Sequence, residues 1–118
     1  MTETTQPDMM RAVVQDVYGG PAVLHMADVP RPTPGPQDVR VRVHAAAVNP
    51  VDAKVRRGGP EGAPVPAAPK ILGWDGAGIV DAVGAAVTDF APGDEVYFAG
   101  DIGRAGAYAE FVCVDARI

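Results

Sequence analysis

The chain has 118 residues, a length that suits one domain. Hydrophobic residues make up 47% of it, which excludes the composition typical of a disordered chain. The net charge of −5 at pH 7 argues against nucleic acid as a partner, because phosphate binding needs a concentrated basic surface.

The N-terminal residues 1–9 are predicted to form a disordered tail. They are polar and acidic, without the basic segment and apolar run of a signal peptide. No apolar run in the chain approaches the length needed to span a membrane. We therefore expect a cytoplasmic protein with no membrane partner.

Short strands separated by turns dominate the rest of the chain, which contains 14 glycines and 12 prolines. The clearest strand is residues 39–44, where three valines alternate with Arg40, Arg42 and His44. This content predicts a mainly β, antiparallel domain resembling a partly open barrel. The other expected strands cover residues 10–17, 23–29, 79–83, 94–98 and 108–114.

One short helix is expected near residues 50–57. Asn49 is a good N-cap, Pro50 suits the first helical position, and Asp52 favours the positive end of the helix dipole. Gly58 and Gly59 end the helix. Capping by itself explains these residues, so the pattern leaves open both a structural and a catalytic role.

Residues 58–69 are predicted to form an irregular loop, and a glycine turn carrying Trp74 and Asp75 follows soon after. Trp74 is the only tryptophan. Its ring could pack in the core or line a binding cleft, and the sequence leaves both roles open.

The sequence has few metal ligands to offer. His25, His44 and Cys113 lie on three separate predicted strands with no ligand-like spacing, which argues against a zinc site. Cys113, the only cysteine, lies in an alternating run and is interpreted as a small core residue. Gly76 and Gly78 lack the third glycine and the helix of a dinucleotide-binding fingerprint.

Charge is distributed unevenly along the chain. Residues 31–70 hold seven of the ten basic side chains and three acidic ones, for a net charge of +4, and the rest of the chain carries −9. Solvated surface faces are one interpretation. The other is a positive cleft wall that attracts an anionic substrate or cofactor.

The order of the motifs along the chain identifies a protein family more specifically than any single motif does. They are Met10-Arg11-Ala12-Val13-Val14, Gly19-Gly20-Pro21, Pro34-Gly35-Pro36, the alternating valines, Asn49-Pro50-Val51-Asp52, Ile71 to Gly78, Val83-Gly84, Phe90 to Val96 and Gly106 to Glu110. This ordered set resembles the N-terminal GroES-like catalytic domain of the medium-chain dehydrogenase/reductase superfamily. It is similar to the zinc-independent quinone oxidoreductase branch, which includes members labelled zinc-type alcohol dehydrogenase-like. The resemblance covers residues 10–118.

The resemblance implies an NAD(P)H-dependent oxidoreductase that reduces quinones or activated alkenes by hydride transfer without zinc, with NADPH as cofactor. Asn49 stands where metal-dependent members have a cysteine, and Trp74 and Asp75 stand at their His-Glu positions. Close relatives often place Tyr where this chain has Lys54. The implied catalytic residues are Lys54, Asn49 and Asp52, where Lys54 or a water held by Asn49 and Asp52 supplies the hydrogen bond to the substrate oxygen.

Further residues follow from the same resemblance. Asn49 and Pro50 are expected at the cofactor, and Trp74, Asp75 and Tyr97 are expected to line the substrate cleft. The family's Rossmann domain should begin shortly after Ile118, so we expect a fragment with little NADPH turnover of its own, and a homodimer at full length. The alternatives are a free-standing GroES-like β-barrel that acts as a binding or assembly module, and a remnant of an alcohol dehydrogenase.

Overall fold

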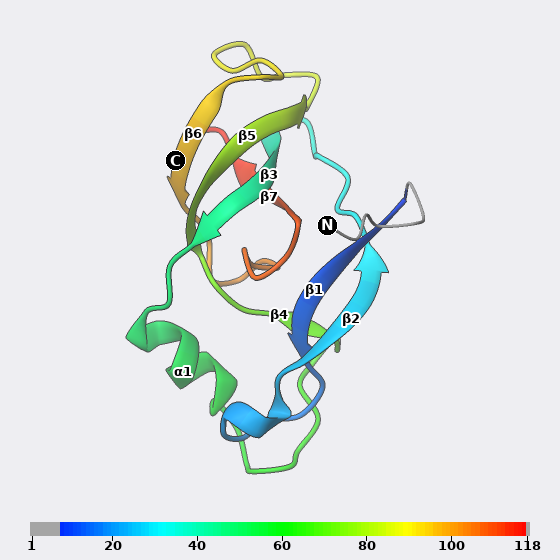
Figure 1. The fold of residues 1–118 in the computed structure, drawn as a ribbon, viewed down its shortest axis with the longest axis vertical. Coiled ribbons are helices and arrows are strands. Elements are labelled where there is room, and N and C mark those ends of the chain that lie inside the picture. Colours follow the sequence, from blue (N-terminus) through cyan, green and yellow to red (C-terminus); the bar gives the residue numbers. More distant parts are fainter. Residues whose placement is uncertain (1–7, 118) are drawn as a thin grey trace.

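The computed structural model describes residues 8–117, which form seven strands, one α-helix and one 3₁₀ turn (Figure 1). The 3₁₀ turn, Pro21–Val23, joins the first two strands, and α1 spans Pro50–Arg56. The strands are β1 (Met9–Gln15), β2 (His25–Pro30), β3 (Asp38–Ala46), β4 (Lys70–Ile71), β5 (Asp75–Val83), β6 (Glu95–Ala99) and β7 (Phe111–Asp115).

The strands make two antiparallel sheets. The smaller has the order β2-β1-β4, with Met10 opposite Val29 and Val14 opposite Ile71. The larger has the order β6-β5-β3-β7. In Figure 1 the larger sheet lies above the smaller one, and α1 lies beside the lower end of the larger sheet. Within residues 8–117 the two sheets do not close into one barrel.

The segment just before β7 joins the two sheets. The backbone N–H of Val13 in β1 donates to the Tyr108 carbonyl at 2.8 Å, and that of Glu110 donates to the Arg11 carbonyl at 3.1 Å. The N–H of Val43 in β3 donates to the Glu110 carbonyl at 2.8 Å. A single three-residue stretch therefore hydrogen-bonds to both sheets.

Two apolar clusters form the core, one under each sheet. β7 contributes to both, because successive side chains of a strand point to opposite faces. Its Phe111 belongs to the cluster with Met10, Ala12, Val14, Val29 and Ile71, and its Val112 and Val114 belong to the cluster with Val39, Val41 and Val80.

The predicted fold class is confirmed: the protein is mainly β with one short helix, and the alternating segment 39–44 lies within β3. β5 begins at Asp75, four residues earlier than predicted, because Gly76 and Gly78 allow β3 to approach closely. A Cβ at Gly78 would collide with the backbone of Arg42. The last strand begins at Phe111, not at residue 108, because residues 108–110 form the connection between the sheets. The two-residue β4 was not predicted.

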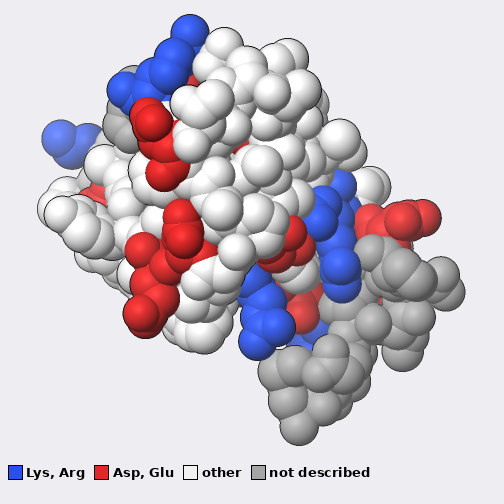
Figure 2. Space-filling model, turned by 90° about the horizontal axis from the view of Figure 1, so that it is seen from above, with Lys and Arg blue, Asp and Glu red and all other residues white. Residues whose placement is uncertain are grey.

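Figure 2 shows acidic and basic side chains in several small groups, some of them side by side, with uncharged surface between the groups. Among residues 8–117 there is no helix long and apolar enough to cross a membrane.

Candidate functional site

The start of α1 is fixed by hydrogen bonds between Asn49 and Asp52. Asn49 has extended backbone angles (φ −123°, ψ 158°) and lies at the N-cap. Its carbonyl accepts from the Asp52 N–H at 3.0 Å, and its own N–H donates to Asp52 Oδ2 at 2.9 Å. This is the acidic half of a capping box, and it turns the Asp52 side chain back toward the strand that delivers the helix.

Asp75 begins β5, the strand next to β3, and meets Asn49 from there. The Asn49 side-chain Nδ2 donates to Asp75 Oδ2 at 2.8 Å, and the Ala47 N–H donates to the Asp75 carbonyl at 2.9 Å. Gly73, with φ at +89°, makes the turn that delivers Asp75, and a Cβ there would collide with the Tyr108 ring. The predicted residues Asn49, Asp52 and Asp75 are thus brought together.

Tyr108 completes this group. Its hydroxyl donates to Asp52 Oδ2 at 2.6 Å. Burial, together with the hydrogen bond to Asp52, raises the pKa of Tyr108, so the phenol stays protonated and acts as a donor. Sequence reasoning assigned Tyr108 no role. It lies 56 residues from Asp52, and the only signal in its segment was the Gly106–Glu110 motif of the ordered set.

Asp52 is buried at the start of α1. Its side chain is buried, with 4% of the residue exposed, and its Oδ2 is shared by the Asn49 N–H and the Tyr108 hydroxyl. Its Oδ1 is buried with no partner. Through these contacts Asp52 links the start of α1 to Tyr108, in the segment that joins the two sheets.

Lys54 lies outside this group. It is exposed on α1 and lines an open pocket with Tyr18, Val55, Gly58, Pro66 and Lys70. No hydrogen bond within residues 8–117 joins it to Asn49, Asp52 or Asp75. Pro50 is exposed at the first turn of α1, next to Asn49.

Trp74 and Tyr97 differ in where they point. Trp74 is only 4% exposed, and its indole N–H donates to the Arg104 carbonyl at 3.1 Å, so the ring packs inside the protein. Tyr97 is 90% exposed and lines an open, mostly apolar groove with Asp75 and the alanines of residues 45–47. Asp75 and Tyr97, two of the three predicted cleft residues, line this groove, whereas Trp74 lies in the core.

The side chains around Asn49 differ from the usual ligands of zinc. The side chains that meet there supply one amide, two carboxylates and a phenol, whereas zinc sites in proteins are built mainly from Cys and His. Between residues 8 and 117 no group of three or more His, Cys, Asp or Glu side chains is arranged to hold a metal ion.

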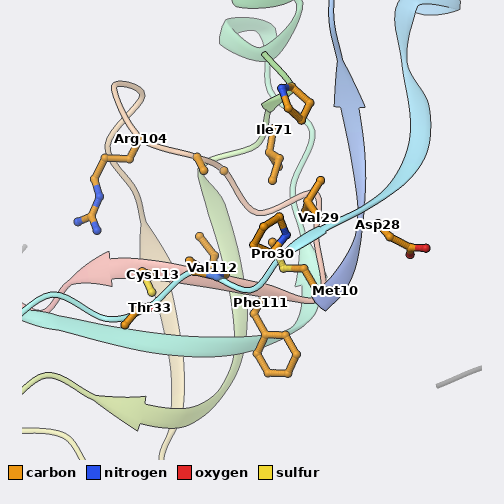
Figure 3. Close-up of a pocket in the computed structure, with 14 residues that line it drawn as sticks. Met10, Asp28, Val29, Pro30, Thr33, Ile71, Arg104, Phe111, Val112 and Cys113 are labelled. Atoms are coloured by element: carbon orange, nitrogen blue, oxygen red, sulfur yellow. The ribbon is translucent and has the colours of Figure 1, made fainter. Parts of the chain in front are cut away.

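A second cavity, of about 430 Å³, lies between the two sheets. Side chains from β1, β2 and β7 surround it, among them Met10, Val29 and Val112, with Arg104 to one side (Figure 3). Cys113 also lines it and is 8% exposed, and burial raises the pKa of its thiol to about 11. The interpretation of Cys113 as a core residue is confirmed, because the thiol is protonated at neutral pH and largely shielded.

Comparison with known proteins decides the family. The alcohol dehydrogenase GroES-like domain matches residues 35–118, which is well over half of the chain. The chain belongs to this family. Helix α1 and strand β5 both lie within the matched residues, and the predicted resemblance is confirmed.

Relatives of this GroES-like domain carry two kinds of name. It is 43% identical over 102 residues to a quinone oxidoreductase from Pseudomonas aeruginosa, covering 86% of this chain and 30% of that protein. It is 42% identical over 88 residues to a zinc-type alcohol dehydrogenase-like protein from Staphylococcus aureus (strain COL), covering 75% and 25%. The structure of a quinone oxidoreductase from Coxiella burnetii superposes with a TM-score of 0.79 at 31% identity, covering 91% and 35%.

The GroES-like domain thus spans about a quarter to a third of the length of these relatives. They place it in an oxidoreductase family. Its site contributes an amide donor, a carboxylate acceptor and an apolar groove, which can bind and orient a small molecule.

Proposed function

We propose that this domain forms one wall of the active site of an NAD(P)H-dependent oxidoreductase that reduces quinones or activated alkenes by hydride transfer without zinc. The observation that supports it most is the Asn49–Asp75 pair, with Asp75 lining the open apolar groove beside Tyr97. A planar, apolar substrate suits such a groove, and two named relatives are quinone oxidoreductases.

Reduction of a quinone or an enone requires a hydrogen bond to the substrate oxygen, where negative charge develops. An asparagine amide has two N–H groups, and Asp75 accepts from the Nδ2 of Asn49, which leaves one N–H for a ligand. We assign that N–H to the substrate oxygen. Asp75 fixes the amide orientation, and Asp52 and Tyr108 fix the helix that carries Asn49. Lys54 stays a candidate for proton supply from the α1 side.

NAD(P)H, when bound, supplies the hydride, and the residues around Asn49 fit a nicotinamide ring. Ala45, Ala46 and Ala47 are exposed, and Val48 is 81% exposed, directly before Asn49 and Pro50. An uncovered apolar run matches the flat face of that ring. We propose that these residues lie against the cofactor and exclude water from it.

A chimera tests the proposal. This chain replaces the matching 102 residues of the Pseudomonas aeruginosa quinone oxidoreductase, and NADPH oxidation with a quinone is followed at 340 nm. We expect activity that survives a metal chelator. Asn49→Ala should lower kcat by about 10-fold or more, the cost of losing a hydrogen-bond donor that acts in the transition state.

Asp89→Asn, on an exposed residue outside the groove, is the control and should leave kcat unchanged. Loss of activity on chelation, or an Asn49→Ala chimera as fast as the parent, contradicts the proposal. The isolated 118-residue chain serves as a second control, in which we expect little NADPH turnover.

A further inference from the structure

The chain contains only two lysines, Lys54 and Lys70, and both line one pocket. They are 16 positions apart in the sequence, Lys54 on α1 and Lys70 on β4, so the fold alone brings them to the same space. The pocket is open, has a volume of about 410 Å³, and is completed by Tyr18, Val55, Gly58 and Pro66. We call it the lysine pocket.

Neither lysine has an ion-pair partner among the residues that the structure describes. Four ion pairs occur within residues 8–117, and their basic partners are His25, Arg40, Arg104 and Arg117. None of the residues lining the lysine pocket is acidic. Two lysines that line one pocket and have no ion-pair partner within the described part of the chain create a local positive potential that attracts an anion.

The walls of the pocket are fixed by contacts that do not involve the lysines. Tyr18 packs against the end of α1: a Cβ at Gly59 would lie 2.5 Å from the tyrosine ring, so only glycine allows this approach. The Tyr18 N–H donates to the Ala63 carbonyl at 2.9 Å. Gln15 Nε2 donates to the Arg56 carbonyl at 3.1 Å and so joins the end of β1 to the end of α1.

We propose that the lysine pocket binds the anionic group of the substrate, so that the enzyme acts on acidic quinones or enones, those carrying a carboxylate, sulfonate or phosphate. This inference rests on the proposed function. Lys54 and Lys70 offer two point charges to the anion, and Tyr18 and Pro66 line the pocket beside them. Lys54 thereby acts as a specificity residue on the same helix that presents Asn49.

Binding to the isolated chain tests the inference with a matched pair of unreactive quinones, anthraquinone-2-sulfonate and the neutral 2-(hydroxymethyl)anthraquinone. Titration calorimetry in low salt should give a Kd about 10-fold lower for the sulfonate, and the difference should shrink as added salt screens the charges. Lys54→Met and Lys70→Met should each raise the sulfonate Kd about fivefold and leave the neutral Kd unchanged.

Arg42→Met is the matched control, since it removes one exposed positive charge from β3 outside the pocket, and it should change the sulfonate Kd less than twofold. Equal binding of the two quinones, no binding of either, or an equal effect of Arg42→Met overturns the inference. Circular dichroism confirms that each variant is folded. A chimera without NADPH oxidation, combined with lysine-dependent sulfonate binding, would remove the reductase proposal and keep the anion pocket.

Discussion

At the scale of single residues, Asp52 determines whether the candidate site keeps its shape. Its carboxylate is buried, and the donors that reach it come from the Asn49 backbone and the Tyr108 hydroxyl. A buried carboxylate is costly unless hydrogen bonds replace its lost hydration. Tyr108, which is 56 positions from Asp52 in the sequence, therefore stabilises the start of α1 through its hydrogen bond to the Asp52 carboxylate.

Tyr108→Phe should lower the free energy of unfolding by about 1–3 kcal/mol, because it removes one of two donors from a buried acceptor. Urea denaturation measures the change. Tyr97→Phe removes the same hydroxyl from a side chain that is 90% exposed and should be neutral. Equal effects of the two substitutions would show that the contact with Asp52 contributes nothing.

At the scale of elements, the loop before β7 is attached to the start of β3 by one ion pair. Arg104 donates to both oxygens of Asp38, at 3.1 and 2.7 Å, and Asp38 also accepts from the Gly35 N–H. The hydrogen bonds from Arg104 hold the pKa of Asp38 below its ordinary value. This loop also carries the carbonyl that accepts from Trp74, so the pair helps to order the core under the larger sheet.

The pair makes stability depend on pH in a defined direction. Because the pKa of Asp38 is lower in the folded state, its contribution is present above about pH 4, the unfolded value, and is lost as the pH falls through the folded pKa. Arg104→Met should be less stable at pH 7 by about 1–2 kcal/mol, and the deficit should shrink toward pH 2.

Urea denaturation at pH 7, 4 and 2.5 checks this expectation. Arg42→Met, which removes an exposed arginine for which the structure shows no ion pair within residues 8–117, should track the parent protein at each pH. An Arg104→Met deficit that stays constant across the pH range would mean that the ion pair is not its source.

At the scale of the whole molecule, two cores are joined through shared segments. β7 supplies side chains to both clusters, and residues 108–110 hydrogen-bond to β1 and β3. Breaking either sheet therefore removes partners from the other. We expect the domain to unfold as one unit.

Two probes test this expectation in a single denaturation experiment. Fluorescence of Trp74, the only tryptophan, reports the interior beside the larger sheet, and far-ultraviolet circular dichroism reports the strands of both sheets. The two curves should coincide, as in a two-state transition. Separate midpoints would show that the two sheets unfold independently.

Strand alternation and helix-capping residues were sufficient to predict β3 and α1 from the sequence. The alternating valines around residues 39–44 and the Asn49-Pro50-Val51-Asp52 helix start lie where they were predicted, because strand alternation and capping act over a few residues. The same signals misplaced the starts of β5 and β7. β5 starts earlier than predicted because its glycines let the β3 backbone approach, and β7 starts later because the residues before it connect the two sheets. Both causes are visible only once the neighbouring backbone is in place.

The sequence by itself determined the family, the mainly β fold and the capped helix, since ordered motifs and local propensity need no knowledge of distant contacts. Only the tertiary structure placed Tyr108 on Asp52, turned Trp74 into the core and brought Lys54 and Lys70 to one pocket. Each of these joins residues from separate elements. Which side chains meet across such distances depends on strand register and crossover, which a single sequence does not specify.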